Sequence, residues 1–210
     1  MKIIATILAQ DKKEFKKQYS HIAPYFKYIQ IDIMDGEFVK NKTKINPYIL
    51  KDIIKDKNLE IHLMVKALSK YITTWSKVKN VKKIIWHYEA NSNKEQIKKF
   101  INFLKKKKIK SGLAFNPTTR IKEIEDLIKD FDTIQVMGVK PGKMGQKFQI
   151  SALEKIKKLR KNYPQLNIAL DGGCNNKNIE KIKKTGTNSV ALGSYLQKCS
   201  DIKKFLKSIS

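Results

Sequence analysis

The segment TIQVMGVKPGKMGQKF (residues 133–148) decides the fold, because it places a short apolar run directly before a glycine-containing loop. The same order returns in LNIALDGG (166–173) and in SVALGS (189–194), and similar β-branched runs precede it along the chain. The expected strands are Ile3–Leu8, Tyr28–Ile33, Leu59–Val65, Lys83–His87, Ser111–Phe115, Thr133–Met137, Leu166–Leu170 and Ser189–Leu192. Eight runs in 210 residues give about 26 residues per unit, enough for a strand, a helix and two short loops.

Helical patterns fill the intervals between these runs. Apolar residues follow the i, i+3, i+4, i+7 spacing of a helix at Ile97, Phe100, Ile101 and Leu104, and again at Ile202, Phe205, Leu206 and Ile209. SALE (151–154) predicts a capping box at the start of another helix. The alternation predicts a parallel sheet covered by helices, and eight units are the number that closes into a barrel. We therefore expect one (β/α)8 TIM-barrel domain over residues 1–210; a doubly wound open sheet is the alternative, but it gives no reason for eight units.

The charge balance is strongly basic, with 45 Lys and Arg residues against 19 Asp and Glu residues and a formal net charge of +26. Such a charge suggests a nucleic-acid partner. However, only Arg120 and Arg160 are arginines, whereas base-reading surfaces favour the planar guanidinium. The lysine run 105–108 ends a helical pattern, where cations complement the helix dipole. We expect solvated helix faces and no nucleic-acid partner, with the charge at most attracting a phosphorylated substrate.

The cysteine content and the apolar segments bear on location. Two cysteines, Cys174 and Cys199, are too few for a disulfide framework, which favours a reducing, cytoplasmic location. No segment has the ~20 apolar residues that span a bilayer, so no membrane partner is expected. The opening MKIIATILAQ (1–10) has no small-residue cleavage site before the charged DKKEFKK (11–17). We expect it to be the first buried strand rather than a signal peptide.

Glycines gather at one end of the predicted strands. Of the nine glycines, seven lie at or just after the carboxyl end of a strand: Gly36, Gly138, Gly142, Gly145, Gly172, Gly173 and Gly193. Tight turns alone would divide the glycines more evenly between the two ends. Because glycine permits close backbone approach, the asymmetry indicates a ligand at the carboxyl end, which is the catalytic face of such barrels.

Two aspartates end apolar strands, Asp32 in YIQIDIMDG (28–36) and Asp171 in NIALDGGCN (167–175). Opposed carboxylates can remove a proton from one face of a carbon and return it to the other. The alternative is that each aspartate caps the following helix. His62 in EIHLMV (60–65) would alone be a core residue, but beside two aspartates it becomes a third ligand for a divalent metal. Such an ion would polarise a carbonyl and stabilise an enediolate.

Further candidates surround these three residues. Methionines near strand ends, which without a ligand would be core filler, can form a water-excluding surface beside a reacting carbon; they are Met34, Met64 and Met137. His87 ends the strand before YEA and is expected to support the site or to contact substrate, whereas His21 is expected to lie in a helix-to-strand connection and to be incidental. Three glycine loops in successive units predict a phosphate cradle: VKPGKMGQKF (139–148), LDGG (170–173) and ALGS (191–194).

Together these motifs resemble the ribulose-phosphate 3-epimerase family of (β/α)8 barrels. The resemblance runs through nearly the whole chain, in IIATILAQD, IDIMDGEFVKN, IHLMV, HYEA, LAFNPTT, VMGVKPGKMGQKF, LDGG and ALGS. It implies catalytic acid/base roles for Asp32 and Asp171, which with His62 would also bind one divalent ion (Zn, Fe, Mn or Co). It implies substrate contacts for Thr6, His62, Met34, Met64, Met137, Gly142, Gly145, Gly172, Gly173, Gly193 and Ser194.

The sequence also departs from the family pattern. Gln30 stands where the family has a metal-ligating histidine; its amide oxygen can still ligate, but more weakly, so metal affinity or preference should change. Glu37 replaces a histidine or apolar residue and Lys40 replaces a proline. Lys143 and Met144 add bulk to the strand-6 loop. Both proton-transfer aspartates are retained, so these changes question the substrate rather than the activity.

The resemblance therefore implies interconversion of D-ribulose 5-phosphate and D-xylulose 5-phosphate. A six- or seven-carbon ketose phosphate is a related alternative. A non-catalytic barrel that binds a phosphosugar or an acidic polymer is the rival from another class. The resemblance further implies a homo-oligomer.

Overall fold

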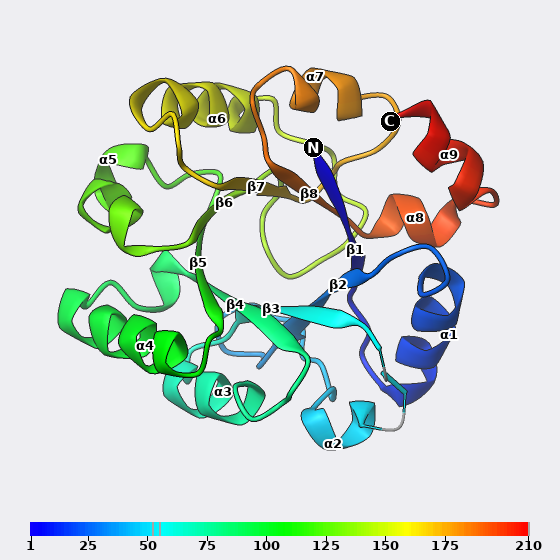
Figure 1. Cartoon of the computed structure of the whole chain (residues 1–210), viewed down its shortest axis with the longest axis horizontal. Coiled ribbons are helices and arrows are strands. Elements are labelled where there is room, and N and C mark those ends of the chain that lie inside the picture. Colours follow the sequence, from blue (N-terminus) through cyan, green and yellow to red (C-terminus); the bar gives the residue numbers. More distant parts are fainter. Residues whose placement is uncertain (52, 55, 210) are drawn as a thin grey trace.

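Eight parallel strands close into a barrel, in chain order, within residues 1–51, 53–54 and 56–209, the part of the chain that the computed structural model describes (Figure 1). Their bounds are β1 Lys2–Ile7, β2 Tyr28–Met34, β3 Asn58–Met64, β4 Val81–His87, β5 Lys110–Phe115, β6 Thr133–Met137, β7 Ile168–Asp171 and β8 Ser189–Leu192. β1 pairs with both β2 and β8, which closes the ring. The predicted (β/α)8 barrel is confirmed, and the open sheet is excluded.

Helices surround the barrel on the outside (Figure 1). The α-helices are α1 Lys12–Ile22, α2 Pro47–Leu50, α3 Leu68–Trp75, α4 Lys94–Lys106, α5 Ile121–Ile124, α6 Ser151–Asn162, α7 Ile179–Lys183, α8 Ser194–Lys198 and α9 Ile202–Ser208, with 3-10 helices η1 Tyr88–Ala90 and η2 Glu125–Asp130. α1 begins where the Asp11 carboxylate accepts a hydrogen bond from the backbone N–H of Glu14 at 2.9 Å. Over the described residues, no helix combines the length and apolarity needed to cross a membrane.

Two local predictions are wrong. SALE (151–154) does not form a capping box, because Ile150 before it already has helical angles (φ −60°, ψ −29°) and no side chain caps this end of α6. Instead, the backbone N–H of Leu153 binds the Ile150 carbonyl at 2.9 Å. His21 lies inside α1 rather than after it, with its Nε2 3.0 Å from the Leu196 carbonyl oxygen.

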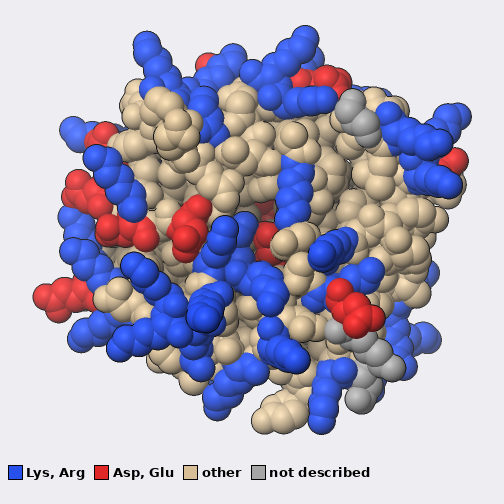
Figure 2. Space-filling view, viewed as in Figure 1, with Lys and Arg blue, Asp and Glu red and all other residues tan. Residues whose placement is uncertain are grey.

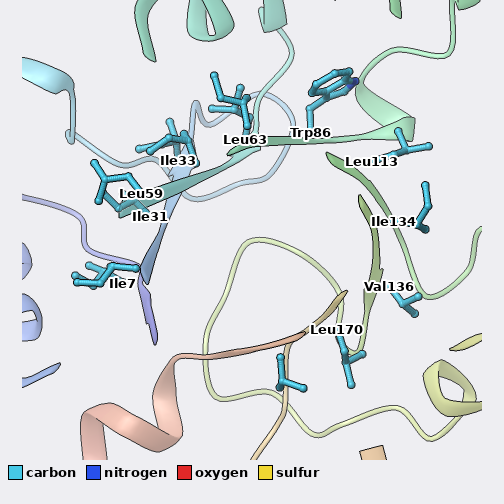
Figure 3. Packing of buried hydrophobic residues seen from close by; sticks show 14 of the residues in the cluster. Ile7, Ile31, Ile33, Leu59, Leu63, Trp86, Leu113, Ile134, Val136 and Leu170 are labelled. Carbon is cyan, nitrogen blue, oxygen red and sulfur yellow. The ribbon is translucent and has the colours of Figure 1, made fainter. Parts of the chain in front are cut away.

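The strands present two different faces, because successive side chains point to opposite sides. Outward side chains pack beneath the helices in one apolar cluster, and Figure 3 shows Ile31, Trp86 and Leu170 among those that point away from the barrel. Inward positions hold buried polar residues: Gln30, Asp32, Glu60, His62, Lys83, His87, Gln135 and Asp171. The interior also holds a small apolar cluster of Ile85, Ala114 and Met137, so the barrel is apolar outside and mixed inside, with these polar groups confined to the interior.

The basic residues lie mainly on the surface. Figure 2 shows Lys and Arg side chains over the rim and centre of one face, with fewer acidic side chains between them. On α4, for example, Lys98, Lys99, Lys105 and Lys106 are exposed while Ile97 and Leu104 are buried. This distribution agrees with solvated helix faces.

Candidate active site

Asp32, His62 and Asp171 meet at the carboxyl end of the barrel. Asp32 on β2 lies beside His62 on β3 in the strand register, and Asp171 is the last residue of β7. All three side chains are buried. One potential ligand atom from each lies within 4.8 Å of the others. The structure therefore brings together the three residues on which the sequence prediction depended.

Hydrogen bonds join the three side chains to two glutamines. His62 Nδ1 lies 3.2 Å from Asp32 Oδ1 and 3.2 Å from Asp171 Oδ2. The Gln30 amide Nε2 donates to both carboxylates, at 2.9 Å to Asp32 and 2.7 Å to Asp171. Gln135 Nε2 donates to Asp171 at 3.2 Å. Both carboxylates are thus held in fixed positions by neutral donors and one imidazole.

Burial and neighbouring groups shift the pKa values of Asp32 and His62. Burial raises the pKa of Asp32, and the nearby Asp171 carboxylate raises it further against the opposing effect of His62. Burial alone would lower the pKa of His62, but its hydrogen bonds to Asp171 and Asp32 outweigh that and raise the pKa to about 9. In the structure as described, a protonated His62 is therefore the counter-charge of the two carboxylates.

The same donor set fits a divalent cation. Two carboxylate oxygens and one imidazole nitrogen suit zinc, iron, manganese or cobalt, and a cation would replace the His62 proton as the counter-charge. Gln30 differs from the prediction in one respect. Its amide nitrogen, not its oxygen, faces the carboxylates, so a ligand role requires the amide to turn over.

A cleft opens above these residues, between β1 and the loops that follow β6, β7 and β8. The predicted residues that line it are Thr6, Asp32, His62, Met64, Met137, Gly142, Gly145, Asp171, Gly172, Gly173, Gly193 and Ser194. Lys140 and Lys143 lie on its rim, so the region is cationic as well as rich in backbone amides. The three loops that were predicted to cradle phosphate thus converge on one cleft.

Met34 and Gln30 do not line this cleft. Met34 is buried, and its backbone N–H donates a hydrogen bond to the Thr43 hydroxyl at 3.0 Å in the chain after β2. Contact between Met34 and a bound molecule therefore stays a prediction. Gln30 precedes Asp32 by two residues on β2, so its side chain lies deeper in the barrel, beneath the two carboxylates.

Two glycines permit close packing of these loops. Gly172 has φ +102°, and a Cβ there would lie 2.4 Å from a methyl carbon of Val139. A Cβ on Gly193 would lie 2.5 Å from the terminal methyl of Met144. The Met144 side chain therefore reaches across the cleft to β8, near Thr6, and fills part of its mouth.

Two residues of the site were not predicted. Gln135 precedes Met137 by two positions, so the alternation of strand residues was a signal that it faces inward. Glu89, two residues after His87, holds a carboxylate oxygen 3.4 Å from the His87 Nδ1. Glu89 stood in the quoted HYEA motif, but no role was predicted for it, because it lies on η1 beyond the strand, where the alternation of strand residues no longer applies.

Comparison with known proteins identifies relatives over most of the chain. The model of the "Ribulose-phosphate 3 epimerase family" matches residues 2–197. A ribulose-phosphate 3-epimerase of Schizosaccharomyces pombe is 31% identical over 199 residues, covering 92% of this chain and 85% of that protein. The enzyme of the same name from Bacillus subtilis is 34% identical over 188 residues, covering 86% and 84%.

A solved structure supports the fold at much lower sequence similarity. The crystal structure of a 3-hexulose-6-phosphate synthase has a TM-score of 0.69 at 12% identity and covers 100% of this chain and 98% of that chain. At this identity the likeness concerns the barrel alone. The family match and the relatives above 30% identity carry further: this chain belongs to the ribulose-phosphate 3-epimerase family.

Proposed function

We propose that this protein is a ketose-phosphate 3-epimerase that interconverts D-ribulose 5-phosphate and D-xylulose 5-phosphate, with Asp32 and Asp171 as the proton-transferring pair. One observation carries the proposal: two buried carboxylates, from β2 and β7, meet over His62 at the floor of a cleft edged by glycine loops. Burial raises the pKa of Asp32, and a carboxyl group with a raised pKa is suited to proton transfer near neutral pH.

The reaction needs one base and one acid on opposite faces of C3. One aspartate carboxylate takes the C3 proton, and the electrons of the broken C–H bond form the C2–C3 double bond as the C2 carbonyl becomes an enediolate oxygen. The other aspartate, in its acid form, then donates a proton to the opposite face of C3. Gln30 and Gln135 hold the carboxylates by donating to them, which limits their motion between the two transfers.

Asp32, His62 and Asp171 would hold the divalent cation. When bound, that ion supplies electrostatic stabilisation of the negative oxygen that develops next to C3. Gln30 could ligate only through its neutral amide oxygen, after its amide turns over and gives up the two hydrogen bonds to the carboxylates. The metal site is therefore expected to be weaker than one with a second imidazole.

The substrate phosphate would bind the loops around Gly142, Gly145, Gly172 and Gly173, together with Gly193 and Ser194, through backbone amides and the serine hydroxyl. Lys140 and Lys143 on the rim support that assignment through their charge. Thr6 would donate its hydroxyl to the substrate, since its Oγ1 is buried in the described structure without a hydrogen-bond partner. Met64 and Met137 would exclude water from C3.

A different ketose phosphate is the second candidate, and Met144 is the observation that favours it. Its side chain crosses the cleft to Gly193, so it alters the space where the phosphate end of the substrate would lie.

We further propose a reducing, cytoplasmic location, in keeping with the free thiols Cys174 and Cys199. A homo-oligomer is the proposed assembly, which light scattering would measure.

The test is proton exchange at C3. The purified protein, saturated with Zn²⁺, Mn²⁺, Fe²⁺ or Co²⁺ in turn, is incubated in deuterated water with ketose phosphates of five, six and seven carbons. Deuterium at C3 of the five-carbon pair is expected, and the relative rates identify the preferred chain length. Tight binding of a phosphosugar without exchange in any metal form would mean that the protein is a phosphosugar-binding protein rather than an enzyme. Absence of both would remove the proposal altogether.

A further inference from the structure

A chain of buried side chains leads from His62 away from the two aspartates. His62 Nε2 lies 2.9 Å from Nε2 of His87 on β4, and the two rings are inclined by only 20°. His62 is 1% exposed and His87 is 0% exposed, so water does not compete for this contact. His62 thus has one ring nitrogen toward the aspartates and the other toward His87.

Glu89 forms the next link. Its Oε2 faces the His87 Nδ1 at 3.4 Å, and neither atom has another hydrogen-bond partner in the part of the chain that the structure describes. Its other oxygen, Oε1, accepts hydrogen bonds from the backbone N–H of Asn116 at 2.8 Å and from the Thr119 hydroxyl. Glu89 is thereby fixed by the loop after β5.

That loop is itself anchored. The Lys155 ammonium of α6 donates to the carbonyl oxygens of Asn116, Pro117 and Thr119, at 3.2, 2.6 and 2.6 Å. Burial would raise the pKa of Glu89, but hydrogen bonds from His87, Thr119 and Asn116 outweigh it and lower the pKa. Glu89 therefore stays ionised and offers only acceptors to its neighbours.

The chain has one consistent arrangement of protons. An ionised Glu89 requires an N–H at the His87 Nδ1. With that N–H donated to Glu89, the His87 Nε2 serves as the acceptor, and because two ring nitrogens 2.9 Å apart can share only one proton, that proton is on the His62 Nε2. The His62 Nδ1, next to Asp32 and Asp171, is left as the nitrogen that can ligate a cation.

We propose that His87 and Glu89 are positioning residues that fix the Nε2–H form of His62 and so direct its Nδ1 to the metal. The proposal rests on the proposed function to the extent that His62 is a metal ligand. Carboxylate–histidine pairs behind metal ligands usually control affinity by about 10- to 100-fold.

Glu89→Gln is the decisive variant, because the loop dictates how the new amide orients. Asn116 and Thr119 both donate to the Oε1 position, so the glutamine oxygen must remain there and its NH₂ group must face His87. The proton pattern then reverses along the chain: His87 carries its proton on Nε2, and His62 must accept there and be protonated on Nδ1. A single isosteric change is thus expected to block the metal-binding nitrogen.

Zinc affinity and ring tautomers are both measured. Zn²⁺ competition with a chromogenic chelator is expected to show at least a tenfold loss for Glu89→Gln, within the range for such supporting residues. Long-range ¹H–¹⁵N NMR of the ¹⁵N-histidine protein, which has only three histidines, is expected to show His87 protonated on Nδ1 in the zinc-loaded wild type. In the variant it should be protonated on Nε2.

Thr119→Val is the matched control. It removes one hydrogen bond to Glu89 and disturbs the same loop, but it leaves the carboxylate that sets the proton pattern. Its zinc affinity is expected to stay within about threefold of wild type, or about 0.7 kcal/mol. An equal loss in Thr119→Val and Glu89→Gln would make the effect structural and overturn the proposal.

Other outcomes separate this inference from the function itself. Unchanged zinc affinity in a folded Glu89→Gln protein overturns the inference, while C3 exchange by wild type leaves the epimerase standing. His87 protonated on Nε2 in the wild type overturns it without any variant, so the test does not depend on Glu89→Gln folding. If wild type binds no zinc, both the metal assignment and this inference fail, whatever the exchange assay reports.

Discussion

The inner and outer faces of the barrel strands differ in chemistry although they alternate along the same residues. On β7, Leu170 points outward into the apolar cluster and its neighbour Asp171 points inward to the candidate site. On β2, Ile31 and Asp32 divide in the same way. Outward side chains stabilise by leaving water, whereas buried inward groups cost free energy unless they are paired. Stability and reactivity should therefore be separable by mutations one residue apart.

The largest expected effect is loss of turnover in Asp171→Asn. The amide has nearly the same shape as the carboxylate but cannot exchange a proton with C3, so the rate of deuterium exchange should fall by about 10²- to 10⁴-fold. Folding stability should not fall, because one of two adjacent buried carboxylates loses its charge. Exchange is followed by NMR in deuterated water and stability by urea titration.

Asp126→Asn is the control, since Asp126 lies on the surface, where its carboxylate pairs with the Lys94 ammonium. It should leave exchange unchanged. A folded Asp171→Asn protein that retained exchange within threefold of wild type would show that Asp171 is not a proton carrier.

Leu170→Ala should have the opposite result. Leu170 is 0% exposed in the outer cluster, so its truncation should lower the free energy of unfolding by about 2–5 kcal/mol through lost burial and a cavity. Exchange per folded molecule should remain near wild type, because the side chain points away from the site (Figure 3). Urea titration gives the first quantity, and exchange well below the melting range gives the second. A large loss of exchange in the folded variant would mean that the two faces are coupled.

The same alternation explains which features were predictable from the sequence. Strand periodicity and strand-end position identified Asp32, His62 and Asp171, because a parallel barrel gathers its carboxyl ends at one mouth. The role of Glu89 was not predicted, because it depends on the packing of the loop after β5 beside β4. This is a contact between residues 27 positions apart in the sequence. The pairing of Met34 with Thr43 was likewise not visible in the sequence, because the Met34 backbone N–H binds the hydroxyl of a residue nine positions later in the chain.

Helix ends were less predictable than strands. The SALE motif has the residue types of a capping box, but α6 is entered from a loop that already turns at Ile150. The path of that loop is set by packing between Gly173 and Phe148, where a Cβ on the glycine would lie 2.8 Å from the Phe148 Cα. At the start of α6, the SALE motif predicts one helix ending, and the tertiary packing of the preceding loop produces another.

Gln30→His should strengthen the inner face as a metal site. Gln30 now directs an amide N–H₂ at both carboxylates, whereas imidazole is a better ligand for a borderline cation than a neutral amide oxygen. Zinc affinity should rise at least tenfold, about 1.4 kcal/mol, in a chelator competition assay. Ile31→Val, on the outward face of the same strand, should leave zinc affinity unchanged while costing about 0.5–1.5 kcal/mol of stability. Equal zinc affinity in Gln30→His and wild type would exclude position 30 from the metal site.

The smallest effect belongs to the outer shell, at the end of α4. Lys108 has φ +58°, and no other described non-glycine residue has a positive φ. The N–H of Lys108 binds the Lys105 carbonyl and the N–H of Ile109 binds the Leu104 carbonyl, both at 3.0 Å, which is the helix ending that favours glycine at position 108. A left-handed conformation costs an L-residue about 1–2 kcal/mol, and replacing that residue by glycine removes this cost. Part of the stabilisation is lost again, because glycine has greater conformational freedom in the unfolded chain. Lys108→Gly should therefore raise the free energy of unfolding by about 0.5–1 kcal/mol in urea titration, with C3 exchange unchanged.

Lys107→Gly, one residue earlier at φ −89°, is the control; it relieves no such strain and should lower the free energy of unfolding instead. A gain in both variants would point to reduced lysine repulsion rather than to backbone strain, and a gain in Lys108→Gly alone would show that the outer shell can be stabilised without touching the inner face.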